Sequence, residues 1–268
     1  MKLSLIVTTF ERPDALACVL RSVARQGDFP DELIIADDGS GPTTRSVIES
    51  FKGRFARPLV HCWQPHDGFR VCRARNLALS RATSDYVVIV DGDMLLHPQF
   101  ISDHRRFAHP GCWVQGTRIL LDERRTAKVI AGDDTSLSPW SAGLGGLRRL
   151  YAARAPLLSS ALARLANTFV ATKSCNLAAW RADLERVNGF NEDMVGWGPE
   201  DKELAARLAH SGVRRRSLTL AGVAYHLAHP PASREHRAAN ERILAQTLEE
   251  RRVQCAHGMR QHRRHESR

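Results

Sequence analysis

Residues 86–93 read Tyr-Val-Val-Ile-Val-Asp-Gly-Asp, an apolar run that ends in two acids around a glycine. An uninterrupted apolar run of this length predicts a strand that is buried on both faces. Three similar strands precede it, separated by stretches with apolar residues at helical spacing: strands at 3–9, 32–36 and 59–63, and helices at 14–25, 44–51 and 70–81. This alternation predicts an α/β fold with a doubly wound, mostly parallel central sheet flanked by helices.

Polar side chains follow three of the predicted strands at the point where each strand ends. Thr8 and Thr9 close the first strand, Asp37 and Asp38 follow the second, and residues 91–93 follow the strand at 86–90. Ligands of open α/β sheets bind beyond the carboxyl ends of the strands. The sequence therefore predicts a functional site at this edge of the sheet.

The length of 268 residues suits one large α/β domain with a small appendage. We expect residues 1–120 and 121–232 to form two halves of this domain, and residues 233–268 to form a basic helical tail. Within the tail, a helix is expected near 234–252, followed by a frayed end. Residues 147–166 carry leucines among arginines, broken near Pro156. We interpret them as an amphipathic helix pair packed on its own domain; contact with a membrane or an acceptor is the alternative.

The formal net charge of +10 favours polyanionic partners: nucleic acid, an anionic membrane surface or a phosphate-rich substrate. Arginine used simply as a soluble surface residue explains the charge equally well. The six cysteines form no C-x-x-C pair, so we expect reduced thiols and a cytoplasmic location. We read residues 3–9 as a buried strand and not as part of a signal peptide, and no apolar run approaches the ~20 residues of a membrane span.

The acids at 91 and 93 suggest a cation site. In an extended chain, residues i and i+2 point to the same side, so Asp91 and Asp93 could converge on one ligand. Two carboxylates make half of a site for Mg²⁺ or Mn²⁺, which diphosphate oxygens would complete. The alternative is that both acids merely cap a turn.

A second acidic pair lies in residues 196–201, Gly-Trp-Gly-Pro-Glu-Asp, before a predicted helix at 202–211. Glu200 and Asp201 could be ordinary acids of a first helical turn, favoured by the helix dipole. We favour a functional role, because a carboxylate held at a helix start stays ionised, as a general base must. Trp197 offers a flat face for a sugar, or belongs to the core.

Seven segments in order resemble the family 2 glycosyltransferases with the GT-A fold: VTTFERP at 7–13, DDGS at 37–40, RARN at 73–76, DGD at 91–93, NGF at 188–190, GWGPED at 196–201 and YHLAHP at 225–230. The second half resembles the galactosyltransferase-type C-terminal module of β-1,4-galactosyltransferases and bacterial chondroitin polymerases. The resemblance spans residues 3–230. It implies a Rossmann-like, nucleotide-sugar-binding half at 1–120 and a smaller acceptor-side, catalytic half at 121–232.

The resemblance also implies how the donor would be bound. Thr8, Phe10 and Arg12 would line the nucleoside pocket. Asp38 would recognise the base through its ring N–H, and Arg75 would contact the base or the diphosphate.

For the metal, the resemblance implies Asp93 and His226 as ligands of Mn²⁺ or Mg²⁺, with His229 as a substitute for His226. Asp91 would hold the ribose or approach the metal. A lone histidine after a strand is more often structural, so only the position of His226 downstream of the acidic pair favours this role.

On the acceptor side, the resemblance implies Asp201 as the catalytic base and Glu200 as the residue that orients a sugar, beside Trp197. Lys173 and Asn176 resemble a segment that lies near the donor. A segment around 196–198 is expected to close and exclude water.

The implied reaction is an inverting, metal-dependent transfer from a nucleoside-diphosphate sugar, by family default a UDP-sugar, to a hydroxyl. The expected acceptor is a glycan or a lipid-linked molecule, and the expected pathway is the synthesis of lipopolysaccharide or another cell-surface polysaccharide. We also expect peripheral contact with an anionic membrane, and no nucleic acid as a partner. The alternatives are a sugar-phosphate nucleotidyltransferase, which normally carries a glycine-rich loop after its first strand, and a basic nucleic-acid-binding protein. With only 6% aromatic residues, the second lacks interleaved aromatics. A non-catalytic sugar-binding domain is disfavoured by the two intact acidic pairs.

Overall fold

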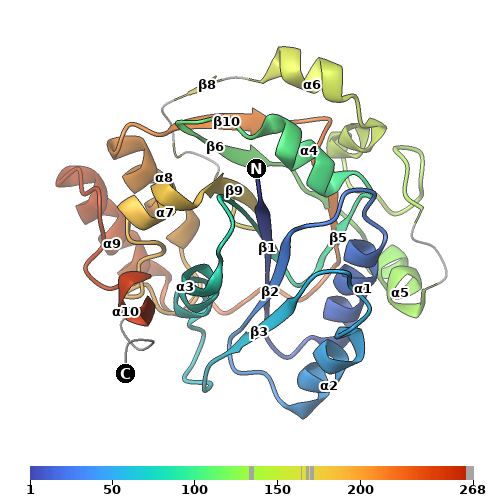
Figure 1. Cartoon of the computed structure of the whole chain (residues 1–268), viewed down its shortest axis with the longest axis horizontal. Helices are drawn as coiled ribbons and strands as arrows, with labels where there is room; N and C mark the ends of the chain where they lie inside the picture. The colour runs from blue at the N-terminus through green and yellow to red at the C-terminus, as the bar shows by residue number, and fades with distance from the viewer. Residues whose placement is uncertain (133–135, 164, 167–168, 170–171, 264–268) are drawn as a thin grey trace.

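The computed structural model describes residues 1–132, 136–163, 165–166, 169 and 172–263. A central eight-stranded sheet has the order β3-β2-β1-β4-β9-β6-β10-β8, and a three-stranded sheet has the order β5-β11-β7 (Figure 1). The strands are β1 Leu3–Thr9, β2 Glu32–Asp37, β3 Leu59–Trp63, β4 Tyr86–Asp91, β5 Met94–Leu96, β6 Cys112–Gly116, β7 Ile119–Leu120, β8 Leu165–Ala166, β9 Asn176–Trp180, β10 Arg214–Leu218 and β11 Ala224–His226. The helices are α1 Pro13–Ala24, α2 Pro42–Phe51, α3 Val71–Arg81, α4 Phe100–Phe107, α5 Glu123–Ala131, the 3₁₀ helix η1 Leu147–Ala153, α6 Pro156–Leu162, α7 Arg181–Arg186, α8 Glu200–His210, α9 Arg237–Glu249 and α10 Arg260–Arg263.

The first four strands of the central sheet run parallel, and β9 is inserted antiparallel between β4 and β6. The register places Thr8 beside Asp91, and Thr9 beside Asp37. The predicted α/β fold with a mostly parallel sheet is therefore confirmed, and the carboxyl ends of the strands meet at one edge, as expected.

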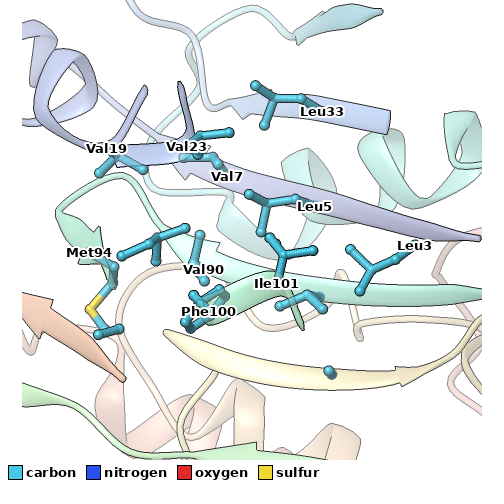
Figure 2. Close-up of a cluster of buried hydrophobic side chains, with 14 of the residues drawn as sticks. Leu3, Leu5, Val7, Val19, Val23, Leu33, Val90, Met94, Phe100 and Ile101 are labelled. Carbon is cyan, nitrogen blue, oxygen red and sulfur yellow. The ribbon is translucent and has the colours of Figure 1, made fainter. Parts of the chain in front are cut away.

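Alternating side chains of the sheet face two helical layers. Leu5 and Val7 of β1 belong to a core with Val19 of α1 and Phe100 of α4, as Figure 2 shows. Ile6, which points to the other face, packs in a second core with residues of α3, α7 and α8. Because both faces are covered, the central strands contain almost only apolar residues.

The three-stranded sheet brings a distant segment to the end of β4. β5 begins directly after Asp93, and β11 pairs antiparallel with it, which places His226 opposite Met94. The Leu227 backbone N–H donates to the Asp93 carbonyl at 3.0 Å. This pairing fixes residues 226–229 beside the Asp-Gly-Asp segment.

The leucines of 147–166 do not form the packed stripe that we expected. Two short helices, η1 and α6, occupy this region, and the side chains of Leu147 and Leu157 are 84% and 74% exposed. Leu150, Leu158 and Leu162 are exposed as well. The expected leucine stripe is wrong, because the break before Pro156 leaves two helices of seven residues each, too short to bury a stripe. η1 packs on the domain through Tyr151 and Ala152 instead, in a core with Ile119 of β7. The Leu165 side chain lies outside the described part of the chain.

The C-terminal segment is less tail-like than the sequence suggested. α9 packs against α8, with Asn240 and Thr247 buried between them. Beyond this helix, Cys255 and Met259 are buried too, so the fraying expected after residue 252 does not occur up to residue 263. Residues 264–268 lie outside the described residues.

Two expectations from composition can be compared with the structure. All six cysteines are buried free thiols, and burial raises the pKa of Cys62 to about 11 and that of Cys175 to about 12. Such thiols stay protonated and behave as small apolar side chains. Within the described ranges, no helix combines the length and the apolarity that a bilayer span needs.

Candidate functional site

A cavity of about 610 Å³ opens at the carboxyl ends of β1 and β4. The cavity is lined by the residues that we expected to bind the donor, hold the metal, catalyse transfer or contact the acceptor: Thr8, Phe10, Arg12, Asp38, Arg75, Asp91, Asp93, Trp197, Glu200, Asp201 and His226. Lys173 and His229 line it as well. The topology thus brings together residues from both halves of the chain.

Asp93 faces two histidines. His226 Nε2 lies 3.6 Å from Asp93 Oδ1, and His229 Nε2 lies 3.5 Å from Asp93 Oδ2. One ligand atom from each residue lies within 4.8 Å of the others, as binding to a single cation requires. Burial lowers the pKa of His226 to about 4, which leaves its ring neutral and able to ligate. The sequence ranked His229 as a substitute, whereas the structure places both rings beside Asp93.

Asp91 does not join this cluster. β4 ends at Asp91 and the chain turns at Gly92 and Asp93, so the alternation of an extended strand no longer applies. A Cβ on Gly92 would lie 2.6 Å from the Thr8 carbonyl, so only glycine allows this turn to approach β1. Asp91 is paired with Arg75 and lies outside the set of ligand atoms within reach of one cation, so its approach to the metal stays a prediction.

Arg75 connects three parts of the site. It is buried, and its Nη2 donates to Asp91 Oδ1 at 3.0 Å. Its Nη1 lies 3.4 Å from Glu200 Oε1, and its Nε donates to Thr8 Oγ1 at 3.3 Å. Arg75 thereby ties α8 to the ends of β1 and β4 and balances the charge of two partly buried carboxylates.

Glu200 and Asp201 form the first turn of α8, in the cavity wall. Burial raises the pKa of Glu200 to about 7; the Arg75 guanidinium opposes this shift and the neighbouring Asp201 adds to it. Burial also raises the pKa of Asp201, against the effect of Arg75 and of the backbone N–H groups of Lys202 and Ser174. Both carboxylates are therefore held less acidic than exposed ones, as is common for groups that exchange protons in a functional site.

Asp38 lies at the far end of the cavity with both carboxylate oxygens engaged. Oδ1 accepts from Gln64 Nε2 at 2.5 Å, and Oδ2 accepts from the Arg70 backbone N–H at 2.8 Å. Each oxygen keeps a second lone pair, so Asp38 can still accept a further bond. Phe10 lies nearby, stacked on His66 with ring centroids 4.5 Å apart.

A profile described as glycosyl transferase family 2 matches residues 4–120, and one described as the N-terminal domain of galactosyltransferase matches residues 160–230. The validoxylamine A glucosyltransferase of Streptomyces hygroscopicus subsp. limoneus is 30% identical over 222 residues, which cover 79% of this chain and 48% of that protein. The chondroitin synthase of Escherichia coli is 27% identical over 92% of this chain and 38% of its own length. The chain carries a glycosyl transferase family 2 domain at residues 4–120.

The chain spans about half the length, or less, of these two relatives. A crystal structure of S. aureus TarS 1-349 in complex with UDP-GlcNAc superposes with a TM-score of 0.63 at 18% identity, covering 98% of this chain and 69% of that one. That likeness confirms the GT-A fold. The matches do not support the two alternatives from the sequence, nucleotidyl transfer and nucleic-acid binding.

Asn176 is placed differently in this glycosyltransferase from what the resemblance implied. It is fully buried at the start of β9 and does not line the cavity. Its Nδ2 donates to the carbonyls of Thr117 and Gly222, and its Oδ1 lies 3.0 Å from His104 Nε2. The expectation that Asn176 lies at the donor is wrong, because its amide joins β9 to neighbouring loops.

The Trp197 segment is held by α9, which the sequence did not indicate. The Asn240 Nδ2 donates to the Val195 carbonyl at 2.9 Å and to the Trp197 carbonyl at 3.4 Å. A Cβ on Gly198 would lie 2.5 Å from Asn240 Nδ2, so this glycine permits close packing on the helix. The closing movement expected of residues 196–198 stays a prediction; in the structure this segment is hydrogen-bonded to α9.

We predict that Gly198→Ala destabilises the protein by about 1–3 kcal/mol, because the added methyl group must displace Asn240. Thermal unfolding followed by circular dichroism measures the effect. Gly27→Ala is the matched control, since a Cβ at Gly27 meets only the Pro98 carbonyl, at 3.9 Å. Equal melting temperatures for the two variants would contradict the prediction.

Proposed function

We propose that this chain transfers a sugar from a UDP-sugar to a hydroxyl of a glycan or lipid-linked acceptor, with inversion at the anomeric carbon and with a divalent metal. We place the reaction in the synthesis of a cell-surface polysaccharide or lipopolysaccharide. The observation that carries the proposal is that the Asp93 cluster and the Glu200–Asp201 pair line one cavity. The UDP-GlcNAc complex of TarS and the chondroitin synthase relative support the donor and the pathway class.

The residues around Asp93 fit Mn²⁺ or Mg²⁺. Asp93 Oδ1 is buried without a hydrogen-bond partner among the described residues, and His226 and His229 face the same carboxylate. One carboxylate and two imidazoles suit Mn²⁺ better than Mg²⁺, which prefers oxygen ligands. When bound, the metal would neutralise the charge that develops on the leaving diphosphate.

The side chains of the cavity would carry out the remaining steps. Asp201 would accept the proton of the acceptor hydroxyl as its oxygen attacks the anomeric carbon from the face opposite the diphosphate. A single displacement of this kind inverts the configuration and needs no second nucleophile. Glu200, held by Arg75, would orient a sugar hydroxyl, and Asp38 would accept the ring N–H of the base.

Titration calorimetry with UDP, in the presence and absence of Mn²⁺, tests the donor site, and NMR of the product anomer tests the stereochemistry. We expect binding that depends on the metal, and transfer with inversion when UDP-sugars and acceptors are screened. GDP serves as the control for base selectivity. A protein that binds neither nucleotide in the presence of Mn²⁺ would overturn the proposal.

We predict an acidic limb in the pH profile of transfer, at higher pH than an ordinary aspartate would give, because burial raises the pKa of Asp201. The raised pKa values of the Glu200–Asp201 pair mean that lowering the pH through this region protonates the base and lowers kcat/KM. In Glu200→Gln the limb should move to lower pH, because a neighbouring negative charge is lost. Rates from about pH 5 to 9 at saturating Mn²⁺ measure both effects; an unmoved limb in the variant would contradict the coupling.

We also propose peripheral contact with an anionic membrane leaflet through residues 140–162. Trp140 is 81% exposed, Leu147 and Leu157 are similarly exposed, and Arg148 and Arg149 are exposed between them. Such a mixture suits the interface of anionic lipids.

We predict that Trp140→Ser with Leu147→Ser and Leu157→Ser lowers co-sedimentation with anionic vesicles at least several-fold, whereas Val60→Ser, at the opposite edge of the sheet, leaves it unchanged. Equal sedimentation of both variants would refute the contact.

A further inference from the structure

Two arginines lie over the ring of Trp197 at the edge of the cavity. The Cζ atoms of Arg234 and Arg237 are 5.4 Å and 5.9 Å from the ring centroid. Both arginines line the cavity and are exposed. Arg237 Nε donates to Glu241 Oε1 at 2.7 Å, whereas Arg234 makes no ion pair with any residue that the structure describes.

The fold places the backbones of both arginines at the start of α9. The Arg237 backbone N–H donates to the Arg234 carbonyl at 3.1 Å, in the turn that begins α9, so the two side chains come from one turn. Asn240, one turn further along, holds the Trp197 backbone to the same helix. The indole and the two cations therefore form one unit and not a chance contact of surface side chains.

The two guanidiniums change which chemical groups of a sugar can bind at Trp197. The sequence suggested a bare aromatic face for stacking, but two guanidiniums already lie against the ring. A guanidinium stacked on an aromatic ring keeps its N–H groups directed outward, and their planar fork matches a carboxylate or a phosphate. The chemistry offered at this wall of the cavity is anion binding beside an apolar surface.

We propose that Arg234 and Arg237, held by Trp197, form an acceptor subsite for an anionic glycan, whose carboxylate or phosphate the two guanidiniums bind. The inference rests on the proposed function, because it takes Asp201 as the base. Trp197 is joined to Asp201 by only three residues, so a group bound here lies on the acceptor side. The Asp93 cluster, where the donor diphosphate is expected, has its own cations in Arg12 and Arg118.

Three oligosaccharides of similar length serve as probes: hyaluronan hexasaccharide, which carries carboxylates, a hexamer of glycerol phosphate, which carries phosphodiesters, and neutral N-acetylchitohexaose. Calorimetry in the presence of UDP and Mn²⁺ gives their affinities. We expect at least one anionic probe to bind the wild type more tightly than the neutral probe does. The double variant Arg234→Gln with Arg237→Gln should weaken that binding roughly ten- to hundredfold and change the affinity for the neutral probe by less than about twofold.

Arg242→Gln is the matched control, because Arg242 is an exposed arginine of α9 that does not line the cavity. It should leave all three affinities unchanged, which separates a specific subsite from a general effect of net charge. The UDP affinity of the double variant should equal that of the wild type. Trp197→Leu should weaken binding of the anionic probe as well, because the guanidiniums lose their support.

The inference is overturned if the neutral probe binds as tightly as the anionic probes or more tightly, or if neither anionic probe binds at millimolar concentration. It is also overturned if Arg242→Gln loses as much affinity for the anionic probe as the double variant does. A tenfold loss of UDP affinity in the double variant would assign the arginines to the donor instead. Failure of the proposed function has a different signature, because the wild type would then not bind UDP at all. The oligosaccharide affinities can also be measured without nucleotide, so the two failures are distinguishable.

Discussion

Asp201→Asn is expected to lower kcat for sugar transfer roughly 10²–10⁴-fold, the range that a positioned general base contributes. Asparagine has the same shape and its side-chain oxygen can still accept from the Lys202 backbone N–H, which donates to Asp201 Oδ1 at 2.7 Å. It cannot take up the proton of an acceptor hydroxyl. The UDP affinity in Mn²⁺ should therefore stay within about threefold of the wild type while turnover is lost.

Two variants make this result specific. Glu249→Gln removes an exposed carboxylate from α9, outside the cavity, and should leave the rate unchanged. Glu200→Gln should cost less than Asp201→Asn, because Glu200 is assigned to orientation and its interaction with Arg75 can be kept by an amide oxygen. If Glu200→Gln abolishes turnover while Asp201→Asn retains most of it, the base is Glu200 and our assignment is wrong.

The sequence was sufficient for the parts of this site that local pattern controls. Periodicity and the positions of glycine and proline predict three parts of the site: the strand at 86–90 with its acids, the strand that ends at Thr9, and the helix after 196–201. Parallel strands then bring their carboxyl ends together without further information. For this reason the residues of the first half were expected at one edge and were found there.

Non-local pairing determines what the local sequence pattern could not indicate, and only the family resemblance implied that His226 meets Asp93. His226 and His229 reach Asp93 because β11 pairs with β5, which lies more than a hundred residues earlier in the chain. Each of these two strands has only three residues, too few for a local pattern that would identify its partner. The role of α9 was missed for the same reason: Asn240 reads as an ordinary helix residue until its bonds to the Trp197 segment are seen. The same helix also contains the uncharged polar residues Gln246 and Thr247, so Asn240 does not stand out in the sequence.

Asp93→Ala is expected to abolish the metal dependence of UDP binding. A divalent ion held by Asp93 would contribute several kcal/mol to the binding of a diphosphate, so the affinity for UDP in Mn²⁺ should fall by at least about 100-fold, to the level measured in chelator. His226→Ala and His229→Ala should each reduce affinity for Mn²⁺, since each removes one of the ligands within reach of one cation. Calorimetry of UDP with and without Mn²⁺, together with direct Mn²⁺ titration by electron paramagnetic resonance, measures both.

Variants of Arg12 and His257 distinguish a metal bound at Asp93 from a general effect of surface charge. Arg12 Nη1 donates to Asp93 Oδ2 at 2.8 Å, so this cation competes with a metal for the carboxylate. Arg12→Ala should therefore bind Mn²⁺ at least as tightly as the wild type, even though Arg12 is proposed to line the nucleoside pocket. His257→Ala, an exposed histidine outside the cavity, should have no effect. If Asp93→Ala keeps metal-dependent UDP binding, the cation is held elsewhere, and the pairing of β11 with β5 has a structural purpose alone.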